Sequence, residues 1–421
     1  MYGANEAAVL EDTALPRYIR ITDVKADGTL HDDTFRSLEE EVAAPFLLRD
    51  GDILLARSGA TVGKSFQYLE SWGRAAYAGY LIRFRPDKSV IFPRFANYYF
   101  QTECYWACIR STLIQATIEN FSAEKYKDLA LPMPTTDEQQ QIAAFLDWKT
   151  GQIDALIAKK KELMEKLKEK RLAAITQAVT KGLNPAAPLR DSGIPWLGQV
   201  PKHWEVKRLR RVVDHIEQGW SPECSNTTAS SDEWGVVKAG CCNGGRFNPD
   251  ENKALPSHLT PPESLEIKEG DLLMSRASGS EELIGSAAVV PSSTRRLLLL
   301  SDKTYRLLYD RELVSPAFLA LALQCPIGRF QIQAVISGAL GLAKNIAQSD
   351  VKDLLLAFPP ICEQEQIATL LQGEMHKLDS LTESVTSAIT RLTEYRTALI
   401  TAATTGKIDV RGLAIPARNR D

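Results

Sequence analysis

The sequence lacks a long hydrophobic run, which argues against helices that cross a membrane. Nowhere do about 18 apolar residues follow one another, and the longest aliphatic run covers only residues 297–300. Residues 1–6 have neither a basic start nor an apolar core, so no signal peptide is expected there. We therefore expect a cytoplasmic protein without a membrane partner.

Clusters of metal ligands or catalytic residues are also missing. Of the seven cysteines, only Cys104 with Cys108 and Cys241 with Cys242 form close pairs, and neither has a second pair at zinc-ligand spacing. The five histidines are isolated, so no Ser-His-Asp or Cys-His arrangement can be argued. These patterns predict reduced thiols, no metal ion and no cofactor.

Motifs for a methyl donor or a nucleotide are absent or incomplete. An adenine methyltransferase would need a glycine-rich cofactor motif and an Asn/Asp-Pro-Pro-aromatic motif, and the nearest string is Asn-Pro-Asp at residues 248–250. Residues 59–65 read GATVGKS, which is one residue short of a phosphate-binding loop, and the matching residues 279–286 contain no lysine. Nucleotide binding is therefore not expected.

What the sequence does contain is an internal duplication. Residues 131–183 and 356–408 share one pattern at a constant offset, and upstream GDILLARSG at 51–59 resembles GDLLMSRASG at 270–279. The matched pairs in the longer repeat include Pro134 and Pro359, Gln139 and Gln364, Asp154 and Asp379, and Arg171 and Arg396. This duplication predicts two units in a pseudo-two-fold arrangement. Because the intervening globular parts match poorly, it also predicts two readers with different specificities.

Each copy is expected to end in a long helix. In the first copy the helix starts at about Thr135, with Glu138 in its first turn, and stops at Gly182. A helix of this length must pack along a partner of similar length, and the partner is the helix of the second copy. The expected heptad positions are Leu371, Leu378, Val385, Leu392 and Leu399 with Ile367, Leu381, Ala388 and Tyr395, and in the first copy Leu146, Ile153, Leu167 and Ala174 with Ile142, Leu156 and Leu163.

The first helix also carries a basic stretch, residues 159–171, with seven basic and three acidic residues. It is interpreted as a solvated helix face, with a surface for DNA phosphates or an acidic partner as the alternative. Residues 191–209 open the second unit and have no counterpart before Met1. By internal symmetry, a segment of this kind is expected to be missing from the front of the first unit.

Taken in order, these motifs resemble the specificity subunits of type I restriction-modification enzymes. The markers are SGIPWLGQVPKHWEVKRL at 192–209, GDILLARSGATVGK at 51–64, the helix start P-x-x-x-EQ-x-QIA in both copies, and the helix ends TKGL and TGKI. The resemblance covers nearly the whole chain. It implies that each globular unit reads one half of a bipartite target in double-stranded DNA. It also implies an antiparallel coiled coil that sets the half-site separation and binds two modification (methyltransferase) subunits, which restriction (translocase and nuclease) subunits join.

We therefore predict an α/β protein with two α/β target-recognition domains separated by two long antiparallel coiled-coil helices. The expected segments are 1–131 for the first recognition domain, with a truncated front, 132–187 for the central helix and linker, 188–355 for the second recognition domain, and 356–421 for the distal helix and tail. The protein should direct adenine methylation and DNA cleavage by its partners and catalyse nothing itself. The alternatives are a coiled-coil scaffold without a DNA role and a self-contained methyltransferase or NTPase, against which the missing motifs argue.

Candidate DNA contacts are basic and polar side chains in matching regions of the two units. The loop at 59–65 could bring backbone N–H groups and basic side chains to DNA, or it could be a tight turn with solvated charges. Arginine and asparagine suit guanine and adenine edges respectively. Asp52 and Asp271, which follow glycine in matching places, are interpreted as turn residues. The candidates are Arg17, Arg20, Thr22, Arg57, Ser58 and Lys64 in the first unit, and Lys238, Asn243, Arg246, Ser275, Arg276 and Ser278 in the second.

Overall fold

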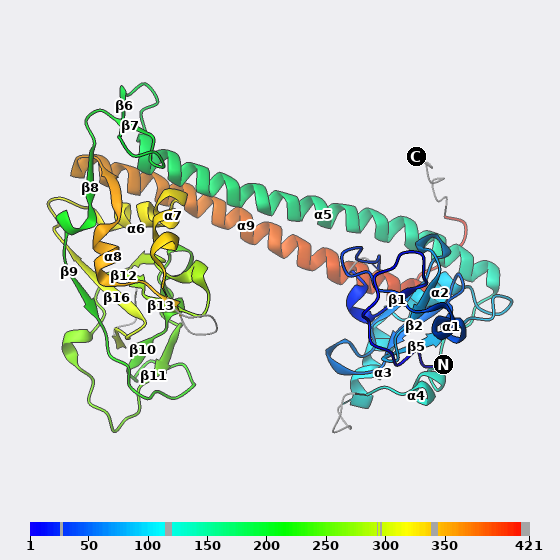
Figure 1. Ribbon diagram of the computed structural model, residues 1–421. Helices are drawn as coiled ribbons and strands as arrows, with labels where there is room; N and C mark the ends of the chain where they lie inside the picture. The colour runs from blue at the N-terminus through cyan, green and yellow to red at the C-terminus, as the bar shows by residue number, and fades with distance from the viewer. Residues whose placement is uncertain (26–27, 114–119, 293, 295–296, 338–343, 414–421) are drawn as a thin grey trace. The chain divides into compact units, whose positions relative to one another are not determined.

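The computed structural model describes residues 1–25, 28–113, 120–292, 294, 297–337 and 344–413. They form two compact units: unit 1 comprises Met1–Glu162 with Val385–Asp421, and unit 2 comprises Leu163–Ser384. Two long helices, α5 (Thr136–Lys181) and α9 (Ile361–Thr404), each contribute one part to both units (Figure 1). No helix among the described residues is both long and apolar enough to cross a membrane.

Unit 1 is built on a three-stranded antiparallel sheet of order β3-β2-β5 and a parallel pair, β1 and β4. Alternate residues of β2 face two clusters of buried side chains, with Ile53 and Leu55 in one and Leu54 and Ala56 in the other. The first cluster also contains residues of α2, α3, α5 and α9. The strands are β1 (Arg17–Ile19), β2 (Ile53–Ala56), β3 (Ser65–Gln67), β4 (Ala75–Tyr77) and β5 (Leu81–Phe84). The shorter helices are α1 (Glu40–Ala43), α2 (Pro93–Tyr99), α3 (Glu103–Leu113) and α4 (Ala123–Lys127).

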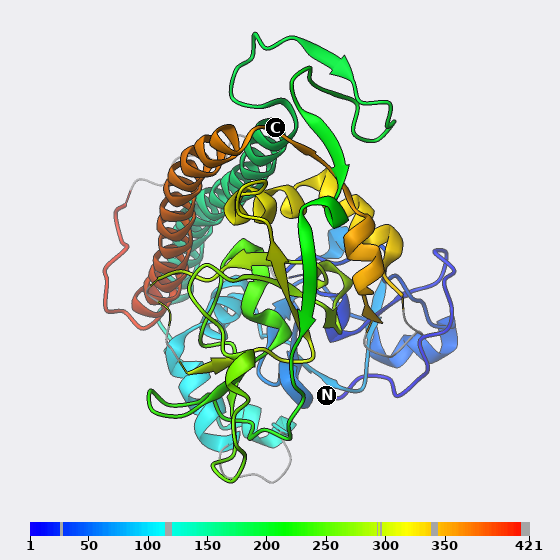
Figure 2. The same cartoon turned by 90° about the vertical axis from the view of Figure 1, so that its left-hand side faces the viewer.

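Unit 2 contains a four-stranded antiparallel sheet of order β14-β12-β16-β9, with smaller sheets around it. Figure 2 turns this unit toward the viewer, with the hairpin of β6 and β7 projecting at the top. Its strands are β6 (Leu189–Asp191), β7 (Gln199–Pro201), β8 (Glu205–Arg208), β9 (Val213–Gln218), β10 (Gly235–Val237), β11 (Asn252–Ala254), β12 (Leu272–Ser275), β13 (Ala277–Ser278), β14 (Ala287–Val289), β15 (Leu298–Leu299), β16 (Thr304–Tyr309), β17 (Lys344–Asn345) and β18 (Leu355–Phe358). Its shorter helices are α6 (Pro316–Gln324), α7 (Pro326–Val335) and α8 (Gln348–Asp353).

The two principal sheets follow one plan, with β2 and β12 as the matching strands between two antiparallel neighbours. Just before β2, Asp52 accepts the backbone N–H three residues upstream at 2.8 Å and pairs with Arg85 at 2.6 Å. Just before β12, Asp271 accepts the equivalent N–H at 2.8 Å and pairs with Arg306 at 3.0 Å. The hydrogen bond with Asp52 raises the pKa of Arg85. Both aspartates therefore close the turn that leads into the strand, which confirms their interpretation as turn residues.

A buried glutamine ties the start of each long helix to its unit. Gln139 of α5 accepts the N–H of Phe92 at 2.7 Å and donates to two backbone carbonyl groups at 2.9 and 3.1 Å. Gln364 of α9 accepts the N–H of Ser315 at 2.9 Å and donates to two carbonyl groups, both at 2.9 Å. Phe92 and Ser315 immediately precede α2 and α6, so each glutamine joins a long helix to the first helix after its sheet.

The long helices lie side by side in both views and run antiparallel (Figures 1 and 2). In unit 1, Arg396 of α9 contacts Asp154 of α5 at 2.9 Å. In unit 2, Arg171 of α5 contacts Asp379 of α9 at 2.7 Å. These four residues are two matched pairs of the duplication, so one contact is made twice with the roles of the helices exchanged. The predicted packing of the two helices against each other is confirmed.

The predicted seam between the helices is confirmed at one of its two positions and is wrong in part at the other. Leu146, Ile153, Leu371, Leu378, Val385 and Leu399 are buried, and the other members of this position, Leu167, Ala174 and Leu392, are half-buried. Leu156, Leu163, Leu381 and Tyr395 are instead 43%, 40%, 52% and 55% exposed. The buried members of the second position, Ile142 and Ile367, lie near the helix starts, in clusters that also contain side chains of the globular parts.

Replacing Gln364 by alanine should lower the free energy of unfolding by roughly 2–4 kcal/mol. The change removes three buried hydrogen bonds and leaves backbone groups without partners. Urea denaturation followed by circular dichroism measures the effect. Gln366→Ala on the same helix is the matched control, because this exposed side chain should change stability by no more than about 0.5 kcal/mol. Equal effects of the two substitutions would contradict the anchoring role of Gln364.

Candidate nucleic-acid interface

In unit 1, four chain segments meet around Arg57, the residue that follows β2 and begins the loop 57–64. Its N–H donates to the carbonyl of Tyr80 at 3.1 Å, and its carbonyl accepts the N–H of Phe121 at 2.8 Å. The guanidinium group lies over the ring of Tyr2, 4.7 Å from the ring centre. Within the described part of the chain, the buried Nε of Arg57 has no hydrogen-bond partner.

Unit 2 repeats this arrangement around Arg276, which follows β12. Its N–H donates to the carbonyl of Lys303 at 2.8 Å, and its carbonyl accepts the N–H of Ile346 at 3.1 Å. Its Nη1 donates to the carbonyl of Asp302 at 3.0 Å, and the guanidinium group lies 5.9 Å from the ring centre of Tyr305. The Nε of Arg276 is also buried and unpartnered among the residues described. In both units, therefore, the same two backbone hydrogen bonds hold one arginine in place. This arrangement is the backbone frame of that arginine.

A glycine brings a further segment against each frame. A Cβ atom on Gly3 would lie 2.2 Å from the carbonyl oxygen of Tyr77, and one on Gly219 would lie 2.0 Å from that of Leu300. Such distances leave no room for any side chain. The two glycines therefore allow the chain to pass directly against the ends of β4 and β15, beside the arginines.

The other candidates of unit 1 divide into paired and accessible groups. Arg17 is buried, donates to the carbonyl of His31 and lies over the ring of Phe35. Arg20 contacts both carboxylate oxygens of Asp23, and this hydrogen bonding raises the pKa of Arg20. The guanidinium groups of both are thus used inside the unit. Thr22 and Lys64 are exposed and Ser58 is half-buried.

In unit 2, Ser275 is fully buried, so its hydroxyl does not reach the surface. Arg246 forms an ion pair with Asp379 of α9, and Lys238 lies 3.9 Å from the carboxylate of Glu251. The two remaining candidates are Asn243, which is exposed, and Ser278, which is half-buried on β13.

Two accessible residues that lie beside the arginines were not identified from the sequence. Tyr80 lies on the turn between β4 and β5 and is 66% exposed. Lys303 lies on the matching turn before β16, with its side chain half exposed. Neither belongs to a motif that both copies share, so the duplication could not reveal them. The one available signal was Gly79, which marks an exposed turn between two β-rich runs.

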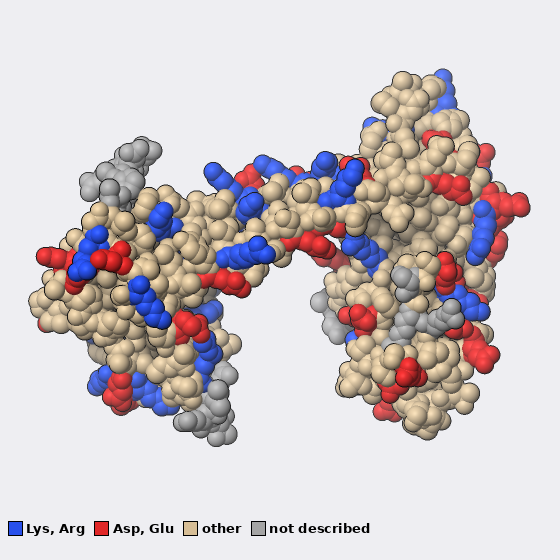
Figure 3. Space-filling view, turned by 180° about the vertical axis from the view of Figure 1, so that it is seen from behind, with Lys and Arg blue, Asp and Glu red and all other residues tan. Residues whose placement is uncertain are grey.

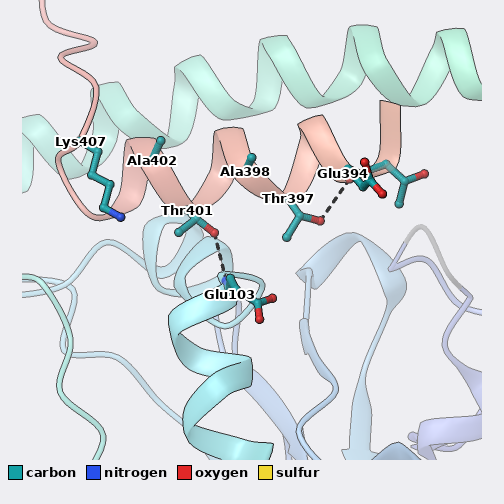
Figure 4. A pocket seen from close by; sticks show the side chains of 8 residues that line it. Glu103, Glu394, Thr397, Ala398, Thr401, Ala402 and Lys407 are labelled. Atoms are coloured by element: carbon teal, nitrogen blue, oxygen red, sulfur yellow. Dashed lines mark hydrogen bonds between the residues drawn. The ribbon is translucent and has the colours of Figure 1, made fainter. Parts of the chain in front are cut away.

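A groove of about 540 Å³ lies in unit 1 between the start of α3 and the last turns of α9 (Figure 4). The hydroxyl of Thr401 accepts the N–H of Glu103 at 3.0 Å, so it caps α3 and holds this helix against α9. No group of three or more metal-ligating side chains occurs in the residues that the structure describes. The lining residues are Glu103, Thr393, Glu394, Thr397, Ala398, Thr401, Ala402 and Lys407.

The basic stretch of α5 is solvent-facing. Lys159, Lys161 and Lys170 are exposed, whereas Arg171 pairs with Asp379. Figure 3 shows Lys and Arg side chains along the long helices with Asp and Glu side chains among them. This mixture of charges favours a solvated helix face over a continuous phosphate-binding surface.

Comparisons with known proteins relate this geometry to a family. Residues 18–169 match the family model described as the type I restriction modification DNA specificity domain. The EcoKI specificity subunit of Escherichia coli strain K12 is 24% identical over 85% of this chain and 75% of its own length. Residues 18–169 of this chain therefore carry a type I restriction modification DNA specificity domain. Over most of its length the chain is similar to a type I specificity subunit.

A second relative matches this chain over a shorter region. The EcoEI specificity subunit of Escherichia coli is 27% identical over 54% of this chain, and the match spans 38% of that relative's length.

Solved structures show that the fold is shared. One comes from a study of complex assembly and conformational transition of the type I R-M system, with a TM-score of 0.71, 14% identity, and coverage of 93% of this chain and 92% of that chain. Another is the HsdS subunit of Thermoanaerobacter tengcongensis, with a TM-score of 0.50, 15% identity, and coverage of 93% and 90%. The predicted α/β fold with two long packed helices is therefore confirmed.

Replacing Gly219 by alanine should destabilise unit 2 by about 1–3 kcal/mol or more, because the new methyl group would overlap backbone atoms of Leu300. The melting temperature of the purified subunit measures this effect. Gly279→Ala is the matched control, since no atom lies within 4 Å of a Cβ built there. If Gly219→Ala melted together with the control, the close approach would be wrong.

Proposed function

We propose that this chain is a non-catalytic type I specificity subunit that reads a bipartite target in double-stranded DNA, with each unit reading one half-site. The observation that carries the proposal is the repeated frame around Arg57 and Arg276 on two units whose surrounding residues differ. Two copies of one frame suit two DNA half-sites, and different surroundings suit different sequences. The proposed contacts are the accessible candidates Thr22, Arg57, Ser58 and Lys64 in unit 1, and Lys238, Asn243, Arg276 and Ser278 in unit 2.

The sequence segments keep their proposed roles. Residues 1–131 and 188–355 would be the recognition domains, and they contain the strands of the two units except for most of β18. Residues 132–187 and 356–421 would be the helical segments, and they contain α5 and α9.

The proposed partners are two modification subunits, which methylate adenine, and restriction subunits, which join them to cleave DNA. Large apolar side chains are exposed on the long helices, and such side chains are typical of protein interfaces. A DNA target would place the complex in the cytoplasm. The exposed apolar residues are Leu156, Leu163, Leu172, Leu370, Leu381 and Tyr395.

Exchanging residues 188–355 for the equivalent segment of another specificity subunit should change one half-site of the methylated motif and leave the other intact. The motif is measured by sequencing methylated positions in the genome of cells that produce the complex, with the parent complex as control. Changes in both half-sites would show that the units read DNA jointly. A parent complex that neither binds nor methylates DNA would instead favour a coiled-coil scaffold.

A further inference from the structure

We propose that Arg57 and Arg276 bind equivalent backbone phosphates of the two half-sites, whereas the neighbouring turn residues Tyr80 and Lys303 read bases. This inference rests on the proposed function, in which each unit contacts duplex DNA. It separates two roles, one for groups that the units share and one for groups in which they differ.

The separation follows from what the two half-sites have in common. Every half-site has phosphates, and only the base edges differ between half-sites. A duplicated reader should therefore keep the group that contacts phosphate and vary the group that contacts bases. Arg57 and Arg276 are kept, and each makes the same two backbone hydrogen bonds. Tyr80 and Lys303 accept one of these bonds with equivalent carbonyl groups, yet their side chains differ.

The two arginines are held in place but carry no carboxylate partner. Neither Arg57 nor Arg276 forms an ion pair with a carboxylate in the described ranges, whereas Arg20, Arg85 and Arg306 each do. In both, the buried Nε lacks an acceptor among the described residues. As whole residues, however, both arginines are only half-buried, so a phosphate oxygen could approach the accessible part of each guanidinium group. Arginine is well suited to this role because its N–H groups can bind two phosphate oxygens at once.

The turn that carries Tyr80 is fixed on both sides of its exposed ring. Gly79 donates its N–H to the carbonyl of Ala4 at 2.6 Å, and Leu81 donates to the carbonyl of Ala78 at 2.9 Å. A large ring on such a turn offers contact area to a thymine methyl group or a base edge at a small entropic cost.

Lys303 offers different chemistry from the equivalent turn. Its ammonium group lies 3.2 Å from the Asp302 carboxylate, and half of the side chain is exposed. Lysine is a donor that suits the acceptor atoms of guanine in the major groove. The two turns would thus select different bases from one backbone frame.

The test compares Arg57→Ala, Arg276→Ala, Tyr80→Ala and Lys303→Ala in complexes assembled with the modification subunits. DNA affinity is measured over a range of salt concentrations, and the methylated motif is read by sequencing. Each arginine variant should lose roughly tenfold or more in affinity for every sequence and about one unit of salt slope, with the motif unchanged. Tyr80→Ala and Lys303→Ala should each relax one base position, in opposite half-sites.

Arg57→Gln separates phosphate binding from support of the loop. It keeps a side chain that can pack on Tyr2 but removes the charge, so the salt slope should fall while the melting temperature stays unchanged. An altered base preference with an unchanged slope would assign Arg57 to base reading and overturn the proposal. Unchanged affinity and slope in both Arg57 variants would leave only a structural role. If the unmodified complex binds no DNA, the proposed function itself fails, which is a distinct result.

Discussion

The structure depends on the antiparallel contact between α5 and α9, because most of the stability of a helix in a protein comes from packing its apolar face against other elements. The contact joins residues far apart in the chain, with 208 positions between Arg171 and Asp379 and 242 between Asp154 and Arg396. Its consequences reach into the globular parts. Leu399, Ile400, Ala403 and Val410 are buried in the main core of unit 1, whose other buried residues all precede position 163. Unit 1 is therefore assembled from both ends of the chain.

The glutamate in the first turn of each long helix has different partners in the two units. Glu138 pairs with Arg411 at 3.5 Å and caps the helix through Thr135. The matching Glu363 instead contacts His203 at 2.8 Å and the buried Trp204 at 3.3 Å. The duplication thus preserves the buried glutamine that anchors the helix, whereas the outer contact changes with the neighbouring segment. A buried amide with three fixed partners tolerates less change than a carboxylate at the surface.

How much the sequence predicts depends on whether the signal is repeated or local. The long helices, their mutual packing and the turn role of Asp52 follow from motifs that occur twice. The exposure of Leu381 does not, because a heptad pattern predicts burial at both of its apolar positions. The pairing of Arg246 with Asp379 depends on segments distant in sequence, so no local pattern indicates it.

The positions that the sequence left unmarked are those where the two units differ. A repeated motif identifies what both units need, which is the strand, the turn and an arginine in a fixed backbone frame. A residue that distinguishes one unit from the other is absent from such a motif by definition. Tyr80 and Lys303 become visible only when their carbonyl groups are seen to bind the two matched arginines in the same way. The matching backbone hydrogen bonds thus show that the two positions are equivalent although their side chains differ. The differing side chains of the two units can then be compared position by position.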